Sequence, residues 1–72
     1  MNRTAVRSRD IAIIGYDAGT QTLEIAFRIG GVYHYSGVPE KTYQGLMTAP
    51  SQGKYFDREI KNRYGYTKVA GT

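Results

Sequence analysis

The 72-residue chain has no cysteine, only two prolines and a single histidine. Without cysteine it can form neither a disulfide framework nor a thiolate metal site, so packing has to stabilise it, and a reducing compartment is permitted. It also lacks the run of about 18 apolar residues that a membrane-spanning helix needs, and its first residues have no apolar signal-peptide core. We therefore expect a cytoplasmic protein with no membrane partner.

The length allows one domain over residues 1–72, with a core that buries only about 60% of the surface exposed on unfolding. Ten basic side chains against six acidic ones give a net charge of +4, which favours polyanionic partners such as nucleic acid. Residues 1–5 are predicted to be a flexible basic arm, and residues 67–72 a flexible tail.

Three short runs of residues predict an antiparallel meander. Residues 11–16 are apolar and mostly β-branched, and turn residues follow them. Residues 21–29 alternate between apolar and polar side chains, which places one face against a core. Gly30 and Gly31 suit a two-residue turn into a third strand at residues 32–36, because glycine adopts positive φ at the lowest cost.

A two-residue turn would fix how the second and third strands pair. It places the following residues opposite one another: Ile29 and Val32, Arg28 and Tyr33, Phe27 and His34, Ala26 and Tyr35. In this register Tyr33 and Tyr35 share a sheet face with Arg28, away from the apolar side chains of the second strand. His34 then lies beside Phe27, where we expect a packed, hydrogen-bonded ring.

Two short helices are predicted after the sheet. Pro39 suits the start of a helix that runs to residue 48, and the Ala49-Pro50 pair ends it. Ser51 is a suitable N-cap for a second helix from residue 52 to about 64. Apolar residues recur at helical spacing on both, namely Tyr43, Leu46, Met47, Phe56, Ile60 and Tyr64. The predicted fold class is therefore α+β, in the order β-β-β-α-α, with both helices on one face of the sheet.

No pattern in the sequence indicates catalysis. His34 has no nucleophile or orienting acid at a recognisable spacing, and no phosphate-binding loop or dinucleotide motif is present. The scattered carboxylates show no metal-ligand spacing. We expect no enzyme activity, no catalytic residue, no metal and no cofactor.

The tyrosines and cations suggest binding. Tyr33 and Tyr35 on an open sheet face beside Arg28 would stack unpaired bases, while cations hold phosphates. The second helix adds a basic stripe at helical spacing, formed by Lys54, Arg58 and Lys61. These six residues predict a non-enzymatic nucleic-acid-binding module, for RNA or tRNA. Three alternatives stay open: a protein–protein interaction surface built on the same tyrosines, tyrosines that only cover the second sheet face or pack under the N-terminal arm or the tail at residues 65–69, and a basic stripe that is a solvated helix face.

Several segments, taken in order, resemble the KTSC domain family. They are residues 14–17, 23–27, 32–35 with the Tyr33-His34-Tyr35 motif, 38–39, and 49–56 with Ile60. The family commonly has asparagine where this chain has Asp57. The family occurs at the C-terminus of some lysyl-tRNA synthetases and as stand-alone bacterial or phage proteins of about this size. The resemblance implies one such domain over nearly the whole chain, and the link to synthetases implies RNA binding.

Overall fold

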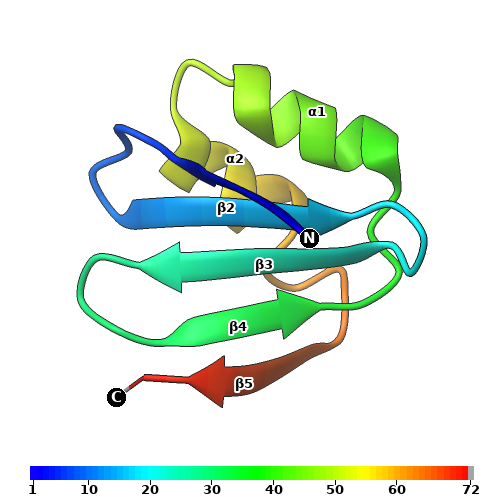
Figure 1. Ribbon diagram of the computed structural model, residues 1–72. Coiled ribbons are helices and arrows are strands. Elements are labelled where there is room, and N and C mark those ends of the chain that lie inside the picture. Colours follow the sequence, from blue (N-terminus) through cyan, green and yellow to red (C-terminus); the bar gives the residue numbers. More distant parts are fainter. Residues whose placement is uncertain (72) are drawn as a thin grey trace.

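The computed structural model describes residues 1–71 and contains seven elements of secondary structure (Figure 1). The strands are β1 (Asn2–Ala5), β2 (Ile11–Asp17), β3 (Thr22–Phe27), β4 (Val32–Tyr35) and β5 (Tyr66–Ala70), and the helices are α1 (Glu40–Thr48) and α2 (Gln52–Glu59). The strands form one antiparallel sheet in the order β1-β2-β3-β4-β5. Within residues 1–71, no helix is long and apolar enough to cross a membrane.

Both ends of the chain extend the sheet, so the α+β class is right but the prediction of three strands is wrong. The expected arm at residues 1–5 contains β1, which pairs with β2, and the expected tail contains most of β5, which pairs with β4. The last residue of that tail, Thr72, lies outside the described residues. Every side chain of β1 and β5 is exposed. These strands therefore add no buried side chain to the apolar core, and no apolar alternation marks them in the sequence.

The connection between β3 and β4 is a four-residue turn. The N–H of Phe27 donates to the carbonyl of Gly31 (3.1 Å), and the N–H of Gly30 donates to the carbonyl of Phe27 (3.0 Å). Both glycines have positive φ, 120° and 92°. Arg28 lies just beyond the end of β3, and its N–H donates to the carbonyl of Asp10 (2.9 Å).

This longer turn makes the predicted register wrong. Tyr35 pairs with Leu23, His34 with Glu24, Tyr33 with Ile25 and Val32 with Ala26. The shift is by three residues, and a shift by an odd number moves every side chain to the other face of a strand. Tyr33 and Tyr35 consequently lie on the apolar, helix-covered face with Leu23 and Ile25.

Both helices cover one face of the sheet, as predicted. They contribute Leu46, Phe56 and Ile60 to a core that also contains Ile11, Ile14, Tyr16, Leu23, Ile25, Tyr35 and Val38. In Figure 1 the helices lie near β2, and β5 forms the sheet edge farthest from them. Ala49 ends α1, and the Ser51 hydroxyl accepts a hydrogen bond from the N–H of Lys54 (3.3 Å) as the N-cap of α2.

Helix α2 is shorter than predicted and ends at Glu59 instead of residue 64. Ile60 leaves the helical region with φ −124°, and the N–H of Lys61 donates to the carbonyl of Phe56 (2.9 Å). The chain reverses here and returns to the free edge of β4, where the N–H of Ser36 donates to the carbonyl of Gly65 (3.0 Å). A helix continued to residue 64 would not allow this return, which is what brings β5 into the sheet.

Candidate binding site

Five aromatic rings form a closed circuit on the helix-covered face, at the side of the sheet where β5 lies. Neighbouring ring centroids are 5.4–5.8 Å apart around the series Phe27, Tyr33, Tyr66, Tyr35, Phe56 and back to Phe27. Four of the five contacts are edge-to-face, the geometry that aromatic quadrupoles favour. Strands β3, β4 and β5 and helix α2 each supply at least one ring.

The rings differ sharply in exposure. Tyr35 and Phe56 are each 5% exposed, Phe27 and Tyr33 are half-buried, and Tyr66 is 61% exposed. Burial, followed by the proximity of the Tyr66 and Tyr33 hydroxyls, raises the pKa of Tyr35 to about 12. Tyr35 therefore belongs to the core, whereas Tyr33 and Tyr66 can contact a ligand.

A groove of about 360 Å³ lies over this circuit, and we call it the aromatic groove. All five rings line it, together with Lys61, Asp10 and Asp57. It therefore combines flat apolar walls with one cation and two carboxylates, as well as the phenol hydroxyls. Of the residues predicted for binding, the structure brings Tyr33, Tyr35 and Lys61 together here.

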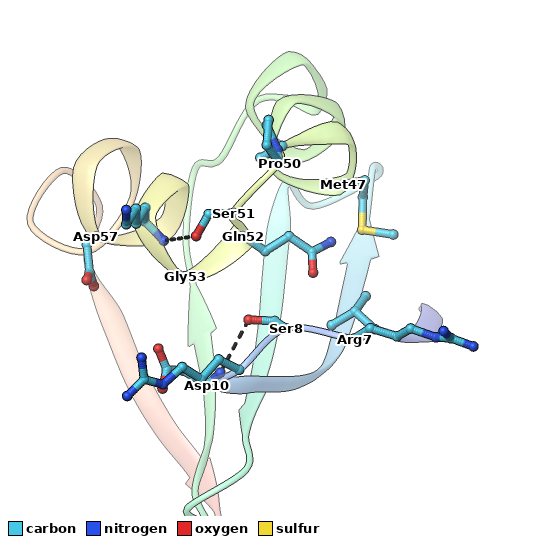
Figure 2. Close-up of a pocket in the computed structure, with 13 residues that line it drawn as sticks. Arg7, Ser8, Asp10, Met47, Pro50, Ser51, Gln52, Gly53 and Asp57 are labelled. Atoms are coloured by element: carbon cyan, nitrogen blue, oxygen red, sulfur yellow. Dashed lines mark hydrogen bonds between the residues drawn. The ribbon is translucent and has the colours of Figure 1, made fainter.

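A second groove, of about 570 Å³, lies between residues 6–10 and the connection from α1 to α2 (Figure 2). Three cations line it, Arg7, Arg9 and Lys54, and we call it the basic groove. Figure 2 shows Gln52 and Met47 pointing from the helices toward residues 7 and 8. Asp10 and Asp57 line this groove as well as the aromatic one, so the two grooves meet at these carboxylates.

Hydrogen bonds hold the segment at residues 6–10 in place. The Ser8 hydroxyl accepts from the backbone N–H groups of Asp10 and Ile11, at 3.3 Å each. The Arg28 guanidinium donates to the carbonyls of Ser8 and Val6, at 2.7 Å each. Arg28 is thus committed to this segment and does not stand beside Tyr33, contrary to the prediction.

The basic stripe predicted for the second helix is divided, and Lys61 lies beyond the end of α2. Lys61 lines the aromatic groove and Lys54 the basic groove, but Arg58 lines neither. Its guanidinium lies 5.6 Å from the centre of the Tyr55 ring and donates to Glu59 (2.9 Å).

Sequence reasoning missed Tyr66, Asp10 and Asp57 as groove residues, along with Arg7 and Arg9. The run at residues 66–70, Tyr-Thr-Lys-Val-Ala, is rich in strand-forming residues and was the available signal for Tyr66. For the two aspartates no local pattern exists, because only the tertiary fold brings the β1–β2 connection beside α2.

The opposite face of the sheet carries an ionic cluster around Glu24, which is only 6% exposed. The Arg3 Nε donates to Glu24 Oε2 (2.6 Å), and His34 Nε2 lies 2.9 Å from Glu24 Oε1. Arg3 crosses β2 at Gly15, where an added Cβ would lie 3.1 Å from its Cγ. The hydrogen bond from Arg3 is the main reason that the pKa of Glu24 is lowered, against the effect of burial.

His34 is therefore hydrogen-bonded as expected but pairs with Glu24 and not with Phe27. It lines neither groove. Among residues 1–71, no three histidine, aspartate or glutamate side chains converge as a set of metal ligands.

Fold and grooves together define a small α+β domain, a five-stranded antiparallel meander with a helical pair on one face and an aromatic groove on that face. The family model of the KTSC domain matches residues 7–64 of the sequence. The chain therefore belongs to the KTSC domain family, as the resemblance implied. The crystal structure of a KTSC domain protein from Yersinia pestis superposes with a TM-score of 0.93 at 43% identity, covering 96% of this chain and 97% of that one.

Two relatives show where such domains occur. An uncharacterized protein of Stutzerimonas stutzeri is 36% identical over 96% of this chain and 99% of its own length. A lysine–tRNA ligase of Trichormus variabilis is 40% identical over 76% of this chain, but the match spans only 10% of the ligase. The same kind of domain is thus found both as a short protein and as a small part of a tRNA ligase.

Proposed function

We propose that this domain is a non-enzymatic module that binds single-stranded RNA, with a base held in the aromatic groove. The observation that carries this proposal is the closed circuit of five rings, in which Tyr33 and Tyr66 are open to a ligand above the buried floor of Tyr35 and Phe56. Stacking of a base on an aromatic ring contributes about 1–3 kcal/mol and tolerates any base. The proposal assigns no catalytic residue, metal or cofactor.

Cations on both sides of the groove would contact the phosphates. Lys61 lines the aromatic groove itself, and the basic groove adjoining it carries Arg7, Arg9 and Lys54. None of these four makes an ion pair with another residue in the range 1–71. Their charges remain available to an RNA backbone, whose binding would weaken as salt rises. Arg58 and Arg28 line neither groove, so the proposed site does not include them.

The relatives support RNA as the ligand class. The ligase of Trichormus variabilis acts on tRNA by its name, so tRNA is a natural first ligand to test. The proposal keeps the cytoplasmic location that the sequence led us to expect, since tRNA is used there.

A second candidate is a protein partner that inserts a cationic side chain. The specific observation in its favour is the presence of Asp10 and Asp57 among the aromatic rings. Aromatic faces attract cations, and carboxylates at the rim would add to that attraction. This alternative uses the same groove and predicts binding to basic peptides in place of RNA.

Fluorescence anisotropy with labelled single-stranded RNA and with tRNA, at about 50 mM and about 200 mM salt, tests the leading proposal. We expect Tyr66→Ala to weaken binding about 5- to 100-fold, because one stacking wall is lost. Tyr66→Phe keeps the ring and should bind nearly as well as the wild type. Lys61→Gln should reduce the slope of log affinity against log salt by about one.

Lys41→Gln is the matched control, because Lys41 is exposed on α1 and lines neither groove. It should leave the affinity close to that of the wild type. Absence of binding by both RNAs at the lower salt would reject the proposal. Equal losses from Lys61→Gln and Lys41→Gln would show that net charge, and not the groove, governs binding.

A further inference from the structure

We infer that the aromatic groove selects bases by their exocyclic amino group, so that bases that carry one, such as adenine and cytosine, bind in preference to uracil. This inference rests on the proposed function and concerns the same site. Its basis is the pair of carboxylates that line the groove, Asp10 and Asp57. Neither base stacking nor phosphate binding uses these two groups.

The charged side chains that line the aromatic groove are mainly acidic. Asp10 and Asp57 are the acids, and Lys61 is the one cation among the residues that line it. The groove is thus locally acidic in a chain whose net charge is +4. A phosphate would be repelled from its interior, whereas the edge of a base carries no net charge. The phosphates are better accommodated beside Lys61 and in the basic groove.

Neither carboxylate has a hydrogen-bond or ion-pair partner among the described residues. Among the described residues, no ion pair or hydrogen bond involves the side-chain oxygens of Asp57, and Asp10 forms its hydrogen bonds through its backbone only. Asp10 is held beside α2, since a Cβ added to Gly53 would lie 3.2 Å from its Oδ2. An ionised carboxylate without a partner at the rim of an apolar groove favours a ligand that brings N–H donors.

The four bases differ in the groups that can donate a hydrogen bond to a carboxylate. An ionised carboxylate only accepts hydrogen bonds, and exocyclic amino groups such as N4 of cytosine donate to it. Adenine and cytosine present such a group next to a ring nitrogen, and guanine presents its N2 amino group next to the N1–H donor. Uracil has no exocyclic amino group, and its single donor, N3–H, lies between two carbonyl oxygens that a carboxylate would repel. The tyrosine hydroxyls both donate and accept, so they do not discriminate.

Anisotropy titrations of three labelled homopolymers of equal length, oligo-rA, oligo-rC and oligo-rU, test this inference. We expect oligo-rA or oligo-rC to bind about five- to tenfold more tightly than oligo-rU, the lower part of the range for one base contact. Asp57→Asn and Asp10→Asn should bring this ratio toward one, because an amide can also donate to the uracil carbonyl. Both substitutions preserve shape, and the thermal midpoint of each variant confirms that it folds.

Glu59→Gln is the matched control, since it removes a negative charge from α2 at a residue that does not line the groove. It should strengthen the binding of all three oligomers alike and leave the ratio unchanged. Equal affinities of the wild type for the three oligomers would overturn the inference while leaving RNA binding intact. If no oligomer binds and an arginine-rich peptide does so in a manner lost in Asp57→Asn, the proposed function fails as well.

Discussion

Tyr33 and Tyr66 meet across β4 and β5 with their ring centroids 5.8 Å apart and their planes at 60°. This contact closes the aromatic circuit, because Tyr66 also reaches Tyr35, with centroids 5.6 Å apart. An edge strand whose side chains are all exposed thereby supplies one wall of the groove. The last strand is thus part of the candidate site as well as of the sheet.

The two tyrosines at this wall should contribute very differently to stability. Tyr66 is 61% exposed, so Tyr66→Ala should cost less than about 1 kcal/mol of the free energy of unfolding. Tyr35→Ala removes a buried ring and should cost about 3–5 kcal/mol, a large part of the stability of a domain of this size. Urea denaturation followed by circular dichroism measures both. A similar cost for the two variants would contradict the assignment of Tyr35 to the buried floor of the groove and of Tyr66 to its exposed wall.

The elements with a buried face were predictable from the sequence, and those without one were not. Alternation at residues 23–27 and the helical spacing of Leu46, Phe56 and Ile60 both reflect packing against the core. Strands β1 and β5 bury no side chain, and their formation depends on backbone groups of β2 and β4 that a local sequence window does not reveal. For the same reason no apolar pattern indicates the wall formed by Tyr66, and the strand propensity of residues 66–70 is its only local signal.

The error in the tyrosine face has a local origin. The glycine pair Gly30-Gly31 predicts a complete two-residue turn, whereas Arg28 and Ile29 also belong to the connection. The hydrogen bond from the Arg28 N–H to Asp10 involves a residue 18 positions earlier, so it leaves no trace in the turn sequence. Tyr33 and Tyr35 line the aromatic groove, but they lie on the face of the sheet opposite to the one that the predicted register gives them.

Gly45 allows the two helices to approach, and this can be tested by substitution. A Cβ on Gly45 would overlap the hydroxyl and ring of Tyr55. Gly45→Ala should destabilise the protein by about 1–2 kcal/mol, since overpacking outweighs the gain of about 1 kcal/mol in helix propensity. In a Tyr55→Ala background the same change should become neutral or stabilising. Thermal unfolding of the wild type, the two single variants and the double variant gives the coupling energy between positions 45 and 55. Additive effects would show that the contact with Tyr55 does not cause the destabilisation by Gly45→Ala.

The buried phenol of Tyr35 predicts a loss of stability at alkaline pH. Its pKa in the folded protein is about 12, above the ordinary value of about 10 for an unfolded tyrosine. The folded state thus holds this proton more tightly, so the stabilisation is complete below pH 10 and is lost as the pH rises toward 12. Tyr35→Phe should remove this part of the decline. Urea midpoints between pH 9 and 12 test it, with Tyr64→Phe, outside the aromatic circuit, as the control expected to keep the decline.

Glu24 predicts the opposite behaviour at acidic pH. Its pKa is lowered in the folded protein, first by the hydrogen bond from Arg3 and then by the one with His34, while burial acts in the other direction. The unfolded state therefore binds this proton more readily. The stabilisation from Glu24 is complete above the ordinary carboxyl pKa and is lost as the pH falls through the lowered one.

Glu24→Gln tests this link, because it keeps the shape of the side chain and removes its charge. We expect a loss of about 1 kcal/mol at neutral pH, where the ionised carboxylate accepts hydrogen bonds from the charged Arg3 guanidinium, and a smaller loss below pH 4. Glu40→Gln is a suitable control, since Glu40 is an exposed acid in the first turn of α1. Parallel stability curves for the wild type and Glu24→Gln between pH 2 and 7 would show that the cluster with Arg3 and His34 does not stabilise the open face of the sheet. Convergence of the two curves at low pH would establish that it does, by tying β1 and β4 to β3 through one carboxylate.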